Sequence, residues 1–355
     1  MKALAPYLEE YGDDGEIPKE YPDGIRKALV THDESTFNAN DDKQYHWKKK
    51  GTEPLKPKSK GKGLMVSEFL TAAQGRLHCI NEDSAGNRHI TSTTEIIQYG
   101  SGKNDDGWWT AEKMVEQVRD KAIPIFEKAF PRKTAVFTFD NSSGHAAMAP
   151  DTLVASRMNL KPGGNQPIMH SIVYGPNNML QSMIFLAHET DNPDLIGKPK
   201  GMRRILEERG LWREGLKKQC KKKKGKKGSE ILDQCETGRD CCAHRILENQ
   251  PDFKGEVSML QTLIKSKGHE CIFYPKFHCE LNFIEFYWAA VKRYTQENCN
   301  YSFKELEETI EKGLDSVPLK TIRRFAGRSK RWMDAYADGL SPKQIRFMEK
   351  VYRSH

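Results

Sequence analysis

The stretch Thr134-Ala-Val-Phe-Thr-Phe-Asp-Asn-Ser-Ser-Gly-His145 organises the rest of the chain. Its first six residues are short, apolar and rich in β-branched and aromatic side chains, which predicts a buried strand. The strand runs into Asp140 and a polar Ser/Gly turn, so it delivers one carboxylate to the edge of a sheet. An aspartate at a strand exit is more often a turn former than a catalytic group, and other segments must decide between the two.

Two further segments have the same form. Residues 28–37 are an apolar strand that ends in acid at Asp33. Residues 271–293 predict a strand, a proline-containing turn and a helix that carries Glu285. Glu285 borders the apolar face of this helix, since apolar residues recur there at helical spacing: Leu281, Ile284, Trp288 and Val291. Three acids on three separate elements are therefore expected at one sheet edge.

At these residues the chain resembles the mariner-type DDE transposases, and its C-terminal part is most similar to fungal members. The resemblance extends from about Pro6 to His355. It implies an α/β fold, an RNase H-like mixed sheet flanked by helices, and an activity that cuts and joins DNA with two divalent ions. The segments that carry it are His-Asp-Glu-Ser-Thr-Phe (32–37), Phe-Asp-Asn-Ser-Ser-Gly-His (139–145), Leu-Asn-Phe-Ile-Glu-Phe-Tyr-Trp (281–288), Tyr274–Glu285 and Ser316–Phe325.

By this resemblance Asp33, Asp140 and Glu285 are the catalytic residues and hold two Mg²⁺ or Mn²⁺ ions. Both cations prefer oxygen ligands, and a pair of ions stabilises the charge that develops on the attacking and leaving oxygens of a phosphodiester. No serine or cysteine nucleophile is then required. His145 matches a family position and is expected to orient substrate or a carboxylate, with a capping or core histidine as the alternative. Asn141 and Asn282 are expected to support the three acids without binding the ions themselves.

The net charge of +8 comes from one segment. Eight lysines fall between Lys217 and Lys227, and without them the chain would be neutral. Such a run indicates a nuclear-localisation or nucleic-acid-binding segment, and a solvated loop is the alternative. The basic residues that we expect to contact DNA phosphates are Lys221, Lys222, Lys223, Lys224, Arg323 and Arg324, the last two lying near Trp332 and Tyr336. A helix that turns these aromatics inward is the alternative for the arginines.

The domain prediction has four parts. Residues 1–26 are a leader, 27–145 with 268–296 form the catalytic domain, 146–267 are an insertion with the lysine-rich loop, and 297–355 are a helical C-terminal extension. Complete family members carry a helix-turn-helix region before the first acidic motif, for which residues 1–26 leave no room. The chain is therefore expected to be a fragment, a truncated gene model or a domesticated remnant, and a non-catalytic DNA-binding remnant is the second hypothesis.

The mean hydropathy of −0.75, with no apolar run of spanning length and no signal peptide, predicts an intracellular, nuclear protein with reduced cysteines. We expect DNA as its partner, a homodimer on that DNA, and no membrane. Cysteine and histidine cluster twice, but in no standard zinc-finger spacing, so a structural Zn²⁺ is the less favoured alternative to buried thiols. The two clusters are Cys235, Cys241, Cys242 and His244, and Cys271, His278 and Cys279.

Two local predictions complete the sequence analysis. Residues 64–70 read as a strand whose Glu68 competes with Asp33 as the first acid, but it lies inside the strand and not at its exit. An amphipathic helix should begin after Thr110 as N-cap and be distorted at Pro124. Its apolar face comprises Met114, Val118, Ala122, Ile125 and Ala129.

Overall fold

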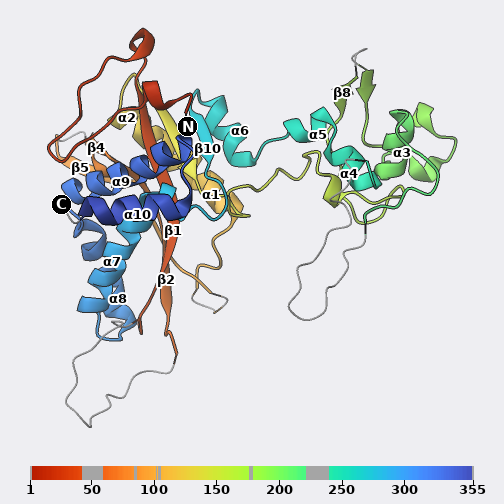
Figure 1. The fold of residues 1–355 in the computed structure, drawn as a ribbon. Helices are drawn as coiled ribbons and strands as arrows, with labels where there is room; N and C mark the ends of the chain where they lie inside the picture. Colours follow the sequence, from red (N-terminus) through yellow and green to blue (C-terminus); the bar gives the residue numbers. More distant parts are fainter. Residues whose placement is uncertain are drawn as a thin grey trace. The chain divides into compact units, whose positions relative to one another are not determined.

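The structure is a computed structural model, and it describes residues 2–41, 59–83, 86–100, 102, 105–175, 179–220 and 240–353. The chain divides into two compact units (Figure 1). Unit 1 combines Met1–Ala147 with Met259–His355, and unit 2 is Met148–Ser258. The predicted insertion runs to residue 267, whereas the helix α6 (Met259–Ser266) belongs to unit 1.

Unit 1 is built on a six-stranded mixed sheet. The strand order is β10-β7-β1-β2-β3, and β6 pairs with β2 as well. β2 is antiparallel to β1, whereas β7 and β10 follow parallel on the other side. The predicted α/β class, with a mixed sheet flanked by helices, is confirmed. The strands are β1 (Lys27–Asn38), β2 (Gly63–Thr71), β3 (Gly75–Arg76), β6 (Glu95–Gln98), β7 (Thr134–Phe139) and β10 (Glu270–Phe273).

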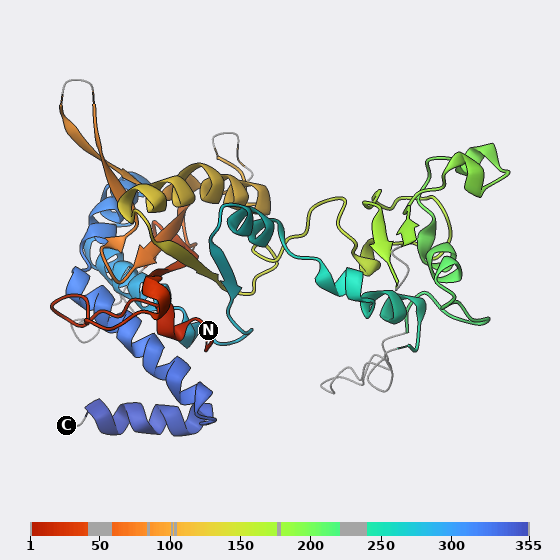
Figure 2. The same cartoon turned by 90° about the horizontal axis from the view of Figure 1, so that it is seen from above.

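Helices cover both faces of this sheet, as the views in Figures 1 and 2 show. On one face α1 (Ala111–Gln117), α2 (Ile123–Ala129) and α6 share a core with Ala28, Val30 and Phe137. On the other face α7 (Ile284–Asn298), α8 (Phe303–Asp315) and α9 (Leu319–Ala337) pack on Leu64, Val66 and Leu70. The C-terminal extension ends with α10 (Pro342–Arg353).

The predicted helix after Thr110 is confirmed, together with its distortion. The Thr110 side chain accepts a hydrogen bond from the backbone N–H of Lys113 and so caps α1. A π-helical turn, Val118–Ala122, separates α1 from α2, because Pro124 has no N–H with which to continue the α-helical ladder. Four of the five predicted apolar residues are buried and Ala129 packs against them.

Smaller elements complete the two units. In unit 1 a separate hairpin joins β4 (His78–Glu82) and β5 (Arg88–Ser92). Unit 2 contains the hairpin β8 (Ile172–Tyr174) and β9 (Met179–Gln181), with α3 (Gly201–Glu208), α4 (Ala243–Glu248) and α5 (Pro251–Gly255) around its own core. Short 3₁₀ turns are Ala5–Tyr7, Pro22–Gly24, Ala155–Arg157, Ala187–Glu189, Pro193–Leu195 and Cys279–Leu281. Within the described residues, no helix combines the length and the apolar character needed to cross a membrane.

A buried histidine makes the stability of unit 1 sensitive to acid. Nδ1 of His269 accepts the backbone N–H of Ala135 at 3.2 Å, and burial lowers the pKa of His269 despite Glu127 at 3.5 Å from Nε2. The neutral imidazole therefore stabilises the fold fully above the unfolded pKa near 6.5, and this stability is lost as the pH falls below it. We expect His269→Gln, which keeps an acceptor and does not titrate, to remove up to about 1.4 kcal/mol of pH dependence per pH unit. Urea unfolding at pH 7.5 and 5.5 checks this, and parallel losses in both proteins would contradict it.

Candidate active site

The strand register brings two of the predicted acids together. β1 and β7 are parallel with Thr31 opposite Thr138, so residues two positions further on in each strand reach the same level. Side chains alternate between the faces with period two, which places Asp33 and Asp140 on the face that α7 covers. Asp140 directly follows the last residue of β7. Asp33, however, lies inside β1, which continues to Asn38, so the predicted strand exit at Asp33 is wrong. The register still brings both carboxylates to the same level on one face.

The third acid comes from the helix that packs on this edge. Glu285 lies in the first turn of α7 and is exposed. Asn282, which is buried, ties the start of this helix to β1, because its side-chain amide donates to the His32 carbonyl at 3.1 Å and its Oδ1 accepts from the Thr31 hydroxyl. Asn282 therefore fixes the position of Glu285 relative to β1.

Asp140 and Glu285 line the same cavity, of about 300 Å³. Burial raises the pKa of Asp33 well above its usual value, and the negative charges of Glu285, Glu34 and Asp140 raise it further. Burial and the charge of Asp140 likewise raise the pKa of Glu285, although Lys292 acts in the opposite direction. The three predicted acids are thus close enough to repel one another. Asn141 lines this cavity as well.

His145 links the acids to the neighbouring strand. It is buried, with Nδ1 2.5 Å from Asp140 Oδ1 and Nε2 3.2 Å from Glu34 Oε1. Burial alone would lower the pKa of His145, but the hydrogen bonds to Asp140 and Glu34 outweigh it and raise the pKa to about 10. At neutral pH the imidazolium therefore donates to both carboxylates. Trp109 Nε1 donates to the same Glu34 oxygen at 2.8 Å and fixes its position.

The donor set fits a hard divalent cation. Carboxylates that repel one another, two of them with raised pKa values, are stabilised by a cation, and Mg²⁺ and Mn²⁺ take oxygen ligands. Among the described residues, the ligand atoms of these three acids do not all lie within 4.8 Å of one another. Two ions about 3.5–4 Å apart need ligands spread more widely than one ion does. His145 and the Ser142 N–H both contact Oδ1 of Asp140 and so fix the orientation of its carboxylate.

A second compact group, His32, Glu34 and His145, does not make a better metal site. Both ring nitrogens of His145 donate to carboxylates. Nε2 of His32 pairs with the Ser67 hydroxyl at 2.8 Å, and the ring is completely buried. These contacts order the strands beneath the acids.

Glu68, the competing candidate for the first acid, serves the fold instead. Its side chain is fully buried, and Oε2 accepts from Arg76 Nε at 2.8 Å and from the Thr94 hydroxyl at 2.7 Å. Oε1 accepts from the Thr93 hydroxyl and from the backbone N–H of Phe69. A carboxylate surrounded by protein donors has no oxygen to offer a solvent-borne ion.

The predicted DNA-contacting residues fall into two groups. Lys221, Lys222, Lys223 and Lys224 lie outside the described residues. Arg323 donates to the carbonyls of Ala72, Ala73 and Asp13, and Arg324 forms a bidentate pair with the Asp13 carboxylate. In the structure both arginines hold the N-terminal segment against α9. The Arg324 side chain is 60% exposed, and contact of the two arginines with DNA stays a prediction.

Basic residues of α9 and α10 that the sequence analysis did not single out lie near Glu285, together with Glu280 and Glu349. Glu285 also lines a second cavity, of about 500 Å³, which is lined by Arg328, Arg346 and Lys350 of α9 and α10. Arg328 pairs with Glu349 in the same cavity, whereas Arg346 and Lys350 are exposed. The basic positions of α10 are dispersed in the sequence and form no run, which is why only the folded chain reveals them.

The loop between β10 and α7 carries an unusual aromatic residue. Phe277 lines the cavity of Asp140 and Glu285, yet its side chain is fully exposed. Its φ of 67° lies in the left-handed region, which is costly for a bulky side chain. The turn thus holds an aromatic ring in solvent beside the acids.

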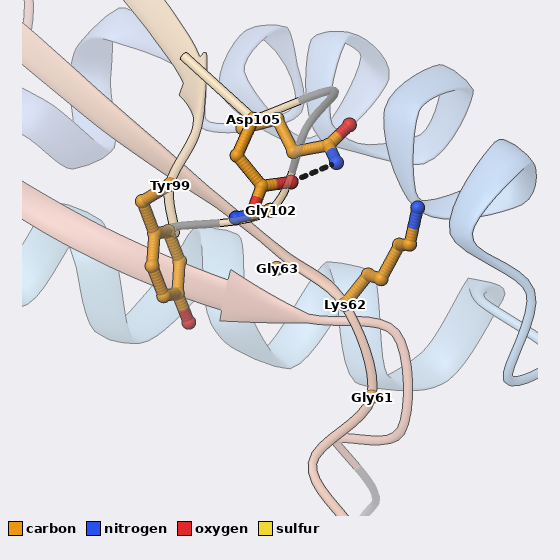
Figure 3. Close-up of a pocket in the computed structure, with 7 residues that line it drawn as sticks. Gly61, Lys62, Gly63, Tyr99, Gly102 and Asp105 are labelled. Carbon is orange, nitrogen blue, oxygen red and sulfur yellow. Dashed lines mark hydrogen bonds between the residues drawn. The ribbon is translucent and has the colours of Figure 1, made fainter. Parts of the chain in front are cut away.

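A third hollow, of about 450 Å³, lies at the start of β2 (Figure 3). Its carboxylate, Asp105, accepts hydrogen bonds from the Gly102 N–H and the Gln98 amide. Its lysine, Lys62, lies over the ring of Phe303. Because both charged groups already have partners, this hollow is weaker evidence for a ligand site than the cavity that Asp140 and Glu285 line.

The predicted cysteine clusters are rearranged by the fold. Cys235 lies outside the described residues, whereas Cys241 and Cys242 lie beside Cys220 in unit 2. His244 instead lies 3.7 Å from Glu248. Cys271 is buried in the core of unit 1, Cys279 is exposed, and His278 pairs with Glu280.

Comparisons with known proteins complete the description. No family model and no curated protein sequence matches this chain. Solved structures with a similar backbone include the Mos1 transposase paired-end complex with the left transposon end and the Mos1 mariner paired-end complex with Mn. Each has a TM-score of 0.41 and 9% identity, over 87% of this chain and 55% of the other. The chain thus spans about half the length of these proteins, and we base its function on its own residues.

Proposed function

We propose that unit 1 is a divalent-metal-dependent enzyme that cuts DNA strands and transfers their ends, with Asp33, Asp140 and Glu285 as its catalytic residues. The observation that carries the proposal is the register of β1 and β7. It places Asp33, inside β1, and Asp140, directly after β7, on one face beneath the first turn of α7. The mutual repulsion of these acids has no evident benefit for folding. It does suit a cation site that is completed when ions and a phosphate bind.

Different residues of unit 1 would have different roles in the proposed reaction. Asp33, Asp140 and Glu285 would hold Mg²⁺ or Mn²⁺, which supplies Lewis-acid stabilisation of the charge that develops on the oxygens of the phosphodiester. His145 and Ser142 keep Asp140 in one orientation through Oδ1. Asn282 anchors the start of α7 on β1 and thereby positions Glu285. No protein side chain is required as a nucleophile.

The basic side chains near the three acids could bind a polyanionic substrate. Lys276 and Phe277 line the cavity that holds Asp140 and Glu285, and Arg346 and Lys350 line the adjoining one. Lysine and arginine side chains contact phosphates without selecting a base sequence. A DNA strand that crosses Glu285 would therefore meet cations on α10 and an aromatic ring at the loop after β10.

We expect Phe277 to stack on a base of the bound DNA. A stacking aromatic is worth about 1–3 kcal/mol per base, so Phe277→Ala should weaken binding of a short single-stranded or frayed DNA by about 5- to 150-fold. Folding stability should hardly change, because the side chain is fully exposed. Fluorescence anisotropy titrations measure the affinity, with Phe277→Trp as the control that keeps a stacking ring. Equal affinities for the wild type and the alanine variant would contradict the assignment.

The proposed activity is tested with end-labelled DNA and the full chain, in Mg²⁺, in Mn²⁺, in Ca²⁺ and with EDTA. We expect strand cleavage in Mn²⁺ and Mg²⁺, and joining of a pre-cut 3′ end to a plasmid. Asp33→Asn and Glu285→Gln should each abolish both products. Glu280→Gln is the matched control, because Glu280 lies in the same segment but bonds to His278 and Tyr336.

The alternative is a DNA-binding protein without catalysis. It predicts salt-sensitive DNA binding with no cleavage in any metal, and binding that is unchanged when the acids are neutralised. That result would overturn the proposed enzyme and leave the basic residues of α10 as the functional site.

A further inference from the structure

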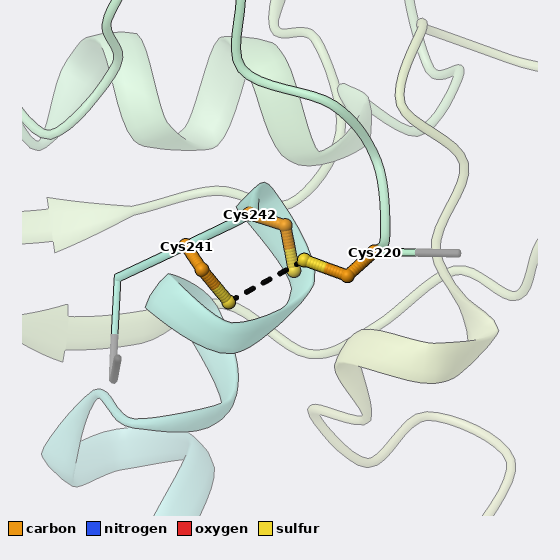
Figure 4. Close-up of side chains that lie close together, drawn as sticks. All are labelled: Cys220, Cys241 and Cys242. Carbon is orange, nitrogen blue, oxygen red and sulfur yellow. Dashed lines mark hydrogen bonds between the residues drawn. The ribbon is translucent and has the colours of Figure 1, made fainter. Parts of the chain in front are cut away.

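Three cysteine thiols converge in unit 2, whereas the proposed active site belongs to unit 1 (Figure 4). The sulfur atoms of Cys220, Cys241 and Cys242 all lie within 4.8 Å of one another, and those of Cys220 and Cys241 are 3.5 Å apart. Cys242 is completely buried, whereas the other two are partly exposed. The cluster is thus sealed on one side and open to solvent on the other.

Backbone contacts bring the thiols together independently of sulfur chemistry. The N–H groups of Ala243 and His244, at the start of α4, donate to the carbonyls of Lys217 and Lys218 at 3.0 Å each. Arg213 pairs with the Asp240 carboxylate at 3.2 Å. These bonds align the segment before Cys220 with the segment that carries Cys241 and Cys242.

We propose that Cys220, Cys241 and Cys242 form a zinc-binding site. Zn²⁺ binds thiolate sulfur at about 2.3 Å, so two sulfurs of a tetrahedral site lie about 3.8 Å apart. The observed spacing is close to this value and far from the bond length of a disulfide, about 2.05 Å. Among the described residues, these three thiolates would occupy three of the four tetrahedral positions. Binding converts three thiols to thiolates and releases their protons to the buffer.

Lysines flank Cys220 in the sequence: it follows Lys217 and Lys218 and precedes Lys221. A bound Zn²⁺ would hold its cysteine ligands as thiolates. The ion would join the chain at the two ends of segment 221–239, which contains six of the eight clustered lysines. This site does not depend on the acids of unit 1.

The test uses the full chain, purified in reductant and freed of metal, with Co²⁺ as the spectroscopic probe. We expect one equivalent of Co²⁺ to give the near-ultraviolet band of thiolate-to-metal charge transfer, which carboxylate ligands do not produce, and Zn²⁺ to displace it. Loss of an outer-shell partner lowers metal affinity by about 10–100-fold, so loss of a ligand in Cys220→Ser or Cys241→Ser should lower Zn²⁺ affinity by at least about 100-fold. Both side chains are partly exposed, so these variants should fold.

Two controls separate this site from the rest of the protein. Cys299→Ser, at a partly buried cysteine of unit 1, should keep the Co²⁺ band, and so should Asp140→Asn. The proposal is overturned if the wild type gives no charge-transfer band, or if the band survives in both Cys220→Ser and Cys241→Ser. It is also overturned if the purified chain contains a Cys220–Cys241 disulfide that forms in preference to zinc binding.

Discussion

Replacing Asp140 by asparagine is expected to lower the rate of DNA strand cleavage at least about 10³-fold, which corresponds to about 4 kcal/mol of transition-state stabilisation. Asparagine keeps an Oδ1 that accepts from the Ser142 N–H and from His145, so the local structure should persist. What disappears is the negative charge and the second carboxylate oxygen. Single-turnover cleavage in saturating Mn²⁺ measures the effect on chemistry, and calorimetric titration with Mn²⁺ measures the effect on metal binding.

Glu280→Gln and an unchanged circular dichroism spectrum are the controls for this variant. Cleavage by Asp140→Asn at the rate of the wild type would show that the site of Asp33, Asp140 and Glu285 is not the active site, whatever other residues contribute. Loss of cleavage with unchanged Mn²⁺ binding would remove Asp140 from the metal ligands. The residue would still be required for cleavage in another role.

Much of the arrangement of Asp33, Asp140 and Glu285 could be predicted from the sequence, because it depends on local rules of strand and helix geometry. A strand with period-two alternation fixes which face a residue occupies, and parallel strands carry their exits to the same edge. Asp140 follows from both rules, whereas Asp33 follows from the first alone, because β1 continues past it to Asn38. A helix whose apolar face packs on the sheet places Glu285 near them. The contribution of Glu34 could not be predicted in this way. It meets His145, 111 residues away, only because β1 and the turn after β7 become neighbours in the fold.

The cysteine cluster and the contacts of Arg323 and Arg324 also depend on residues that are distant in the sequence. Cys220 lies 21 residues from Cys241, with a lysine-rich segment between them, so no zinc-finger spacing relates them. Their proximity depends on backbone bonds between residues 217–218 and 243–244. Arg323 and Arg324 are basic residues near aromatics, as expected of a phosphate-binding site. In the folded chain both donate hydrogen bonds to Asp13. Composition identifies charged groups, and only packing shows which of them remain free for a ligand.

Arg76→Met is expected to be the most destabilising of these substitutions, by about 3 kcal/mol, because it leaves the Glu68 carboxylate buried without its cation. Glu68 is fully buried on β2, and Arg76 also contacts Asp315 at the end of α8. The estimate is at the lower end of the usual range because donors from Thr93, Thr94 and the Phe69 backbone remain. Hydrogen exchange of the β2 amides measures the effect in unit 1 without assuming that both units unfold together.

The double variant Glu68→Gln/Arg76→Met identifies the cause. If the cost arises from an unpaired buried charge, removing that charge should recover more than half of the lost stability. The Oε1 of the neutral amide can still accept from the Thr93 hydroxyl and the Phe69 backbone N–H. If the cost arises from lost packing of the arginine stem, the double variant should be no more stable than Arg76→Met. Recovery would establish Glu68 as a structural acid paired to Arg76, and would leave Asp33 as the acid that β1 contributes to the proposed metal site.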